Sequence, residues 1–145
     1  MVGTRKDIYQ TNFDRLVKLG ICDEAGVIRP DGKSESKPYM DLVLEAVPHY
    51  SFRHSSSEAI YISLAHYFKQ NGDLCSDPEM VLIIHPSLKS VEAFSYQLAI
   101  PAVYQEVYPN ADQVHLKFKK QQNSFLRTWL TNLIEQDHGV CWIDR

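Results

Sequence analysis

The sequence predicts an α+β fold, with an N-terminal helix, an antiparallel meander of about five strands, and a C-terminal amphipathic helix packed on one sheet face. Three observations lead to this prediction. Apolar residues recur at helical spacing within 8–19, a wide apolar stripe covers 118–134, and the runs between them show no helical pattern. Strands that follow one another without intervening helices pair as an antiparallel meander, not as βαβ units.

The first helix is predicted from Phe13, Leu16 and Val17, which are separated by charged residues. Gly20 follows at the place where a left-handed residue commonly ends a helix. Residues 21–38 are rich in Gly, Pro, Ser and charge, and we expect a loop region there, with room for a short ribbon at Val27-Ile28.

The strands are predicted from runs that end at prolines or polar turns. They lie within 40–47, 58–68, 80–85, 91–98 and 103–108, and residues 48–57 are expected to form a connection. The 58–68 run alternates clearly, so that Ile62, Leu64 and His66 share one face. Tyr61 and Tyr67 belong to the opposite face.

The last helix is predicted from a stripe that includes Leu126, Trp129 and Leu133. Its cap is expected at Asn123 or Ser124, or the helix begins earlier near Lys117, and Asp137-His138-Gly139 supplies the stop. A stripe with large aromatic residues is typical of core packing. Two such helices cover one face of the sheet, so we expect the other face to be partly exposed, occupied by a loop, or buried by a partner.

Length and composition fit one globular α+β domain spanning residues 1–145. Hydrophobic residues make up 44% of the 145 residues and charged residues 23%, which argues against disorder. The formal charge is −3, whereas a protein that neutralises phosphates carries a basic excess. The composition therefore argues against nucleic acid as the main partner.

Cysteine usage and the termini point to a cytoplasmic protein. Cys22, Cys75 and Cys141 are odd in number and form no CxxC pair, so we expect reduced thiols and no disulfide framework. No N-terminal run resembles a signal peptide, and no segment has the roughly 18 apolar residues of a membrane span. We expect no membrane association.

Polar and acidic residues concentrate between the second and third expected strands, where we predict a long hairpin loop. His66, Asp73, Asp77 and Glu79 lie on it or beside it, with Asn71-Gly72 as a turn dipeptide. Two interpretations stay open, a simple turn and a ligand or metal site. The spacing does not match a calcium loop, and no nucleotide-binding, zinc-protease or hydrolase motif is present. The sequence therefore predicts no cofactor and assigns no metal ligand.

Tyrosines on the strands indicate a second possible surface. If they gather on the open face they form an amphipathic surface for a protein partner, although tyrosine also fills half-buried strand positions. The candidate ligand- or partner-binding residues are His66, Tyr67, Gln70, Asn71, Asp73, Asp77, Glu79 and Tyr96.

A series of motifs between residues 39 and 138 carries a family resemblance. In order they are Met40–Val43, Leu64–Tyr67, Gln70–Asp73, Asp77–Met80, Glu92–Gln97, Val107–Pro109 and Asn123–Leu130. This series resembles the YqiB-like family of small bacterial proteins of unknown function. The resemblance implies a bacterial protein, implies no catalytic activity, and directs attention to the 66–79 hairpin and the Glu92–Gln97 strand.

Three function hypotheses follow. The first is a non-catalytic binding or accessory module that engages another protein, or itself, through the open sheet face or the 66–79 hairpin. The alternative is a small enzyme or ligand-binding protein with His66 as acid or base and Asp73, Asp77 and Glu79 as orienting groups or metal ligands. The third, nucleic-acid binding, requires Lys117, Lys119, Lys120 and Arg127 to cluster beside exposed tyrosines.

Overall fold

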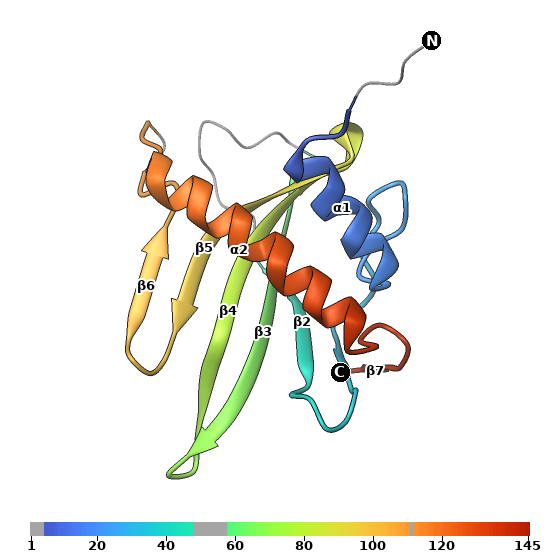
Figure 1. The fold of residues 1–145 in the computed structure, drawn as a ribbon, viewed down its shortest axis with the longest axis vertical. Helices are drawn as coiled ribbons and strands as arrows, with labels where there is room; N and C mark the ends of the chain where they lie inside the picture. The colour runs from blue at the N-terminus through green and yellow to red at the C-terminus, as the bar shows by residue number, and fades with distance from the viewer. Residues whose placement is uncertain (1–4, 48–57, 111) are drawn as a thin grey trace.

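The computed structural model describes residues 5–47, 58–110 and 112–145 (Figure 1). The predicted connection at 48–57 lies outside the described residues. In chain order the elements are α1 (Ile8–Lys18), β1 (Gly32–Ser34), β2 (Leu42–Ala46), β3 (Ile60–Gln70), β4 (Asp73–His85), the short 3-10 helix η1 (Pro86–Leu88), β5 (Ser90–Leu98), β6 (Val103–Glu106), α2 (Leu116–Glu135) and β7 (Trp142–Asp144).

The N-terminal helix is confirmed, and α1 begins with a reciprocal cap. Asp7 accepts a hydrogen bond from the backbone N–H of Gln10 at 2.9 Å, and the Gln10 side chain accepts one from the Asp7 N–H at 3.2 Å. This capping box satisfies N–H groups that the first turn leaves without helical partners. Gly20 follows the helix with φ of 73°, the left-handed conformation expected there.

The C-terminal helix is also confirmed, and α2 takes the earlier of its two predicted starts. His115 caps it by accepting a hydrogen bond from the Phe118 N–H at 3.4 Å, so Asn123 lies well inside the helix. Asp137 and Gly139 follow the helix with positive φ, as the predicted stop requires. No helix in the described residues is long and apolar enough to cross a membrane.

The strands form one antiparallel sheet in the order β6-β5-β4-β3-β2-β1-β7. The predicted meander is confirmed, but the prediction of about five strands is too low. β1 and β7 are three residues each, and they pair through Lys33 and Ile143. Strands this short cannot show an alternating pattern, so β1 is hidden inside the predicted 21–38 loop region. Val27-Ile28 contributes only an isolated bridge, from Ile28 to Cys22.

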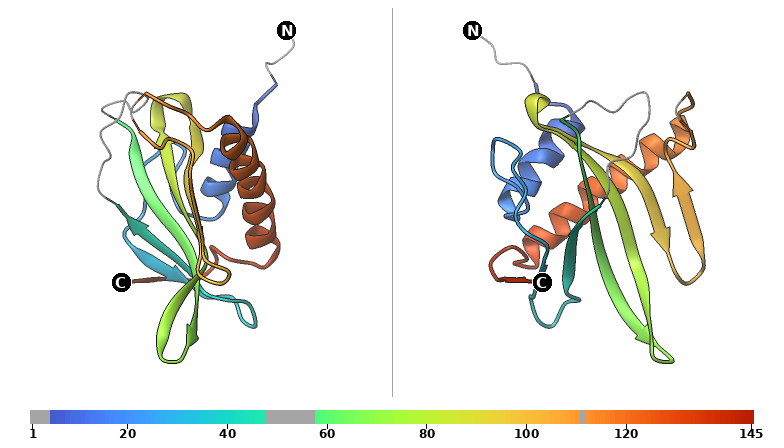
Figure 2. Two further views of the ribbon diagram at one scale, coloured as in Figure 1. Left: turned by 90° about the vertical axis from the view of Figure 1, so that its left-hand side faces the viewer. Right: turned by 180° about the vertical axis from the view of Figure 1, so that it is seen from behind.

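Both helices cover the same face of the sheet (Figures 1 and 2). The main core lies between them and the sheet, where Phe13 and Leu16 from α1 and Leu130 from α2 meet Ile62 and Leu82 from the central strands. This arrangement confirms the predicted inward face of β3 and the predicted packing of α2. Burial of the apolar stripe on each helix supplies most of its stability, because in proteins the packing of an amphipathic face contributes more than helix propensity.

The opposite face carries a smaller apolar cluster near β5. Tyr61, Ile83 and Phe94 are buried there against Val107 and Tyr108, the two residues that follow β6. The Val107 N–H donates to the Phe94 carbonyl at 2.9 Å and holds this segment against the sheet. Over the lower part of the same face, at β1, β2 and the ends of β3 and β7, the described residues place no helix (Figure 2).

The prediction of a long acidic loop between β3 and β4 is wrong. The chain turns within Asn71 and Gly72, whose φ angles are 54° and 85°, and Gln70 pairs directly with Asp73. An Asn-Gly pair with both residues at positive φ is the favoured two-residue hairpin turn. Residues that we expected in a loop, including Glu79, therefore belong to β4. Their polarity reflects strands that are mostly exposed or half-buried, not a break in pairing.

The hairpin extends beyond the rest of the sheet. β2 pairs with β3 only as far as Ala65, and β5 pairs with β4 only from Glu79 onward. Residues 67–76 consequently form a two-stranded ribbon that projects past α2 and the neighbouring strands (Figure 1). We call this segment the β3–β4 ribbon.

Candidate functional site

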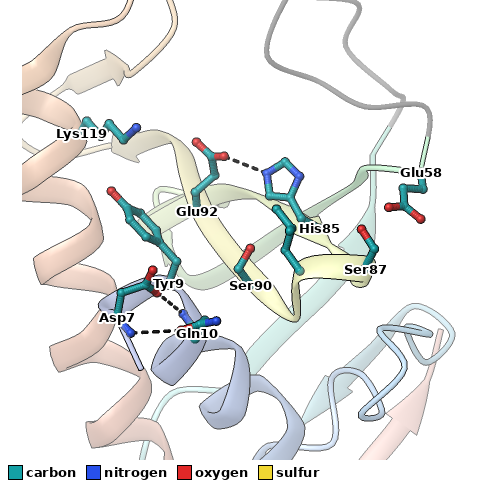
Figure 3. A pocket seen from close by; sticks show the side chains of 10 residues that line it. Asp7, Tyr9, Gln10, Glu58, His85, Ser87, Ser90, Glu92 and Lys119 are labelled. Carbon is teal, nitrogen blue, oxygen red and sulfur yellow. Dashed lines mark hydrogen bonds and ion pairs between the residues drawn. The ribbon is translucent and has the colours of Figure 1, made fainter. Parts of the chain in front are cut away.

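A polar pocket of about 560 Å³ lies at the opposite end of the same strands, where β4 turns into β5 (Figure 3). Its wall combines His85 from β4 and Glu92 from β5 with Tyr9 from α1 and Lys119 from α2. Ser87 and the exposed Leu88, in the η1 connection between the two strands, complete one side. The α1 cap, through Asp7 and Gln10, lies at the edge. We call this site the His85–Glu92 pocket.

Glu92 is the centre of a partly buried hydrogen-bond network. Its side chain is 17% exposed, and it accepts a hydrogen bond from His85 Nε2 at 2.7 Å and another from the Tyr108 hydroxyl. Burial alone raises the pKa of Glu92, but the hydrogen bonds from His85 and Tyr108 outweigh burial and bring that pKa below its ordinary value. The carboxylate is therefore ionised and acts only as an acceptor.

The network fixes the proton on His85. Because ionised Glu92 can only accept, the nitrogen that faces it, Nε2, must carry a hydrogen. In the neutral ring Nδ1 is then the acceptor, on the side of the ring turned away from Glu92 (Figure 3). Nδ1 of His85 has no hydrogen-bond partner among the described residues. A carboxylate that holds one ring nitrogen and leaves the other open is an arrangement that can accept a proton or a donor group.

Tyr9 and Lys119 form the wall nearest the helices. The Lys119 Nζ lies 5.8 Å from the centroid of the Tyr9 ring, a cation–π distance. The pKa of Tyr9 is raised by burial and by the negative charges of Glu92 and Asp7, so its phenol is neutral. Tyr108 is held neutral in the same way, because burial and its bond to Glu92 raise its pKa.

His66, the strongest sequence candidate, lies in a different environment. The Trp129 indole N–H donates to His66 Nε2 at 3.2 Å, so the other nitrogen, Nδ1, carries the hydrogen and donates to the Asp41 carbonyl at 2.9 Å. Burial lowers the pKa of His66, although the bond to Asp41 opposes this shift. Both ring nitrogens are satisfied by neutral groups, which is the geometry of a structural histidine.

Two other candidates lie on the helix side with His66. Asp77 is close enough to act electrostatically on both His66 and Tyr96. Tyr96 packs edge-on against Phe125 at 5.4 Å, and its pKa is raised by burial and by Asp77. His66 also lines a groove of about 530 Å³ beside Trp129 and Pro78, under α2.

Two more candidates lie on the open face. Glu79 accepts a hydrogen bond from the Ser63 hydroxyl at 2.9 Å. Burial and the charges of Glu79 and Glu45 raise the pKa of Tyr67. Strand alternation thus places Tyr67 and His66 on opposite sides of the sheet although they are neighbours in sequence.

The remaining candidates are at the tip of the β3–β4 ribbon. Gln70, Asn71 and Asp73 are all exposed and form the hairpin turn and its first pair. The hairpin candidates therefore divide among three environments and do not meet at one point. Within the described residues there is no group of three or more His, Cys, Asp or Glu side chains that could hold a metal ion.

Tyr67 does contribute to a concavity, on the open face. A groove of about 730 Å³ runs between the ribbon and β7, with Val43, Tyr67 and Ile143 among its apolar lining. Its charged residues are balanced, with three cations, Lys33, Lys69 and Arg145, and three anions, Asp41, Glu45 and Asp144. We call this site the open-face groove.

The His85–Glu92 pocket is the part of the molecule that the residue patterns did not single out. His85 precedes Pro86 at a strand end, and Glu92 is the one charged residue of the segment Ser90–Leu98. The family resemblance marks both the Glu92–Gln97 strand and Val107–Pro109, and the structure joins these two motifs through the bond from Tyr108 to Glu92. A buried charge in a strand was the available signal, because such a charge requires partners.

Comparison with known proteins identifies a family but no activity. Residues 12–139 match the model of a domain of unknown function, DUF6908, and the chain belongs to this family. Neither the curated proteins nor the solved structures contain a match. The family match does not extend to the YqiB-like family or to a bacterial source, and that resemblance stays a prediction.

Proposed function

We propose that this member of the DUF6908 family is a non-catalytic protein-binding or accessory module whose partner docks in the open-face groove beside the β3–β4 ribbon. The observation that supports this proposal is the groove itself, a concavity of about 730 Å³ on a sheet face that neither α1 nor α2 covers. The ribbon forms one wall, so both surfaces predicted from the sequence contribute to one docking site.

The chemistry of the groove suits a protein surface. Leu74 on the ribbon is 68% exposed and Ile143 on β7 is 43% exposed, so apolar side chains border the groove from two sides. Burying a side chain such as Leu74 contributes about 1.5–3 kcal/mol. Tyr67 adds an aromatic ring with a polar tip, a residue type enriched at interfaces.

The charge of the groove favours protein over nucleic acid. Three cations against three anions give no net attraction for a phosphate backbone. Two of the pairs are internal, since Arg145 lies 3.0 Å from Glu45 and Lys33 lies 3.7 Å from Asp41. A groove with equal numbers of positive and negative side chains is complementary to a protein surface whose charges are also mixed and balanced. A second copy of this chain is one such partner.

The setting of the proposed function is the bacterial cytoplasm. The resemblance to the YqiB-like family supports a bacterial source. Cys22, Cys75 and Cys141 are free thiols, which is the usual state of cysteine in that compartment. The alternative of a His/Asp/Glu site at the 66–79 hairpin gains no support from the geometry, because Asp73 is at the ribbon tip while His66 is bonded to Trp129.

The test compares two exposed leucines at opposite ends of the molecule. Leu74→Asp disrupts the groove, whereas Leu88→Asp changes a residue of similar exposure, 64%, far from it. We expect partner capture by tagged full-length protein in its own cells, or dimerisation measured by light scattering, to be lost in Leu74→Asp and kept in Leu88→Asp. Equal behaviour of the two variants, or a monomer that captures nothing, contradicts the proposal.

A further inference from the structure

A second and independent binding site is present at the His85–Glu92 pocket, at the opposite end of β4 from the ribbon (Figures 1 and 3). We propose that this pocket binds a small primary amine in its protonated, cationic form. His85 Nδ1 accepts a hydrogen bond from the ammonium group, and the carboxylates around the pocket supply the opposite charge. This site shares no residue with the open-face groove.

His85 offers a hydrogen-bond acceptor, Nδ1, that no described residue uses. Glu92 holds Nε2–H at 2.7 Å, which orients the ring and leaves Nδ1 as a lone pair at the pocket wall. The His85 side chain is only 13% exposed, so the ring that carries this acceptor is largely buried. A ligand that fits must bring an N–H or O–H donor.

The side chains that line the pocket carry a net negative charge. The pocket is lined by three carboxylates, Asp7, Glu58 and Glu92, against one ammonium, Lys119. Tyr9 adds no charge, because its phenol is neutral. The excess of two negative charges disfavours anions and attracts a cation, and a protonated amine is a compact cation that also donates hydrogen bonds.

The rest of the pocket lining fits the carbon chain of such a ligand. Leu88 and the ring of Tyr9 are the apolar surfaces, and Ser87 and Ser90 carry hydroxyls. A volume of about 560 Å³ is within the range of small-molecule sites. Lys119 is drawn toward the Tyr9 face, where its charge is partly satisfied.

The test uses three probes of equal length that differ in charge, n-butylamine, n-butanol and butyrate. Titration of the full chain is followed by backbone and imidazole NMR signals. We expect butylamine to shift signals of His85 and its neighbours, with an affinity at least about tenfold above the other two probes, because a hydrogen bond to a charged group is worth this factor or more. Equal affinities of the three probes overturn the proposal.

Two charge variants at the pocket rim should change butylamine affinity in opposite directions. Neither variant removes a member of the hydrogen-bond network of His85, Glu92 and Tyr108. Glu58→Gln should weaken butylamine binding about two- to fivefold, and Lys119→Met should strengthen it by a similar factor. Glu45→Gln removes the same charge from the distant groove and serves as the matched control. A control that weakens binding as much as Glu58→Gln, or an unchanged affinity in Lys119→Met, overturns the proposal.

Removing the acceptor itself is the strongest variant. His85→Phe keeps a ring in place but abolishes Nδ1, and we expect butylamine affinity to fall at least about tenfold. The NMR spectrum shows directly whether this variant is folded. A folded His85→Phe protein that binds butylamine as tightly as the native chain overturns the proposal, and an unfolded one leaves the rim variants to decide it.

Discussion

Two histidines on the central hairpin have opposite environments. His66 on β3 lies between the Trp129 indole and the Asp41 carbonyl, and both of its nitrogens are satisfied by uncharged groups. His85 at the end of β4 is bonded to an ionised carboxylate through one nitrogen, its other nitrogen has no hydrogen-bond partner among the described residues, and its ring lines a pocket. The partner of a histidine, more than its burial, therefore distinguishes a structural ring from one available for binding.

The largest expected effect comes from removing the indole that covers His66. Trp129 is 6% exposed and belongs to the main core. Trp129→Ala should lower the free energy of unfolding by about 3–5 kcal/mol, through the lost packing and the acceptor left open on His66. Denaturant unfolding measures this loss.

Phe125→Ala is the matched control for that variant, because Phe125 lies one helical turn earlier on α2 and is 37% exposed. We expect a clearly smaller loss from it. Equal losses in the two variants contradict a structural role for the Trp129–His66 contact.

The second effect compares the two histidines directly. His66→Leu leaves the Trp129 N–H and the Asp41 carbonyl without partners, and should cost about 1–3 kcal/mol of stability. His85→Leu should cost less, because Glu92 keeps its bond from Tyr108 and is partly exposed. Thermal unfolding of both variants ranks them, and a larger loss in His85→Leu reverses the comparison.

The third and smallest effect is the pH dependence of stability. The pKa of folded His66 is below 6.5, so the unfolded chain binds the proton first. The stability that neutral His66 contributes is therefore fully present above pH 6.5 and is lost as the pH drops from 6.5 toward the folded pKa. His138 acts in the same direction, because burial and the neighbouring His66 lower its pKa too. His66→Leu should flatten this slope in part, and an unchanged slope refutes the assignment.

Glu92 acts in a lower pH window. Its folded pKa lies below 4.5, so the stability that it contributes is present above pH 4.5 and is lost as the pH falls through the folded value. Glu92→Gln should flatten the acid limb below pH 4.5 and leave the slope near pH 6 unchanged. Urea unfolding over the pH range separates the two windows, and a change confined to the upper window contradicts the network around Glu92.

The fold was largely predictable because its signals are periodic. The alternation from Ile60 to Phe68 and the stripe on α2 each bury one face, and both assigned that face correctly. β1 and β7 were missed because a strand of three residues has no period to detect. The polarity of the acidic hairpin predicts a loop, because polarity normally marks one, whereas the structure has a paired ribbon that extends beyond the sheet.

The candidate sites were less predictable because they depend on contacts between distant segments. The partner of His66 is 63 residues away on α2, and the hydroxyl that holds Glu92 comes from Tyr108, 16 residues on. No local spacing carries that information. A histidine on an apolar strand is a candidate site residue in the sequence, but only the fold shows which imidazole ring is hydrogen-bonded to a carboxylate.

The most direct test of the comparison is the ring tautomer of each histidine, measured by 15N NMR of the imidazoles well above their ordinary pKa of about 6.5. Signals are assigned with the His66→Leu and His85→Leu variants. We predict opposite neutral tautomers, with the hydrogen on Nδ1 in His66 and on Nε2 in His85. The same tautomer in both rings, or a hydrogen on Nδ1 of His85, contradicts the account of a structural histidine and a binding histidine on one hairpin.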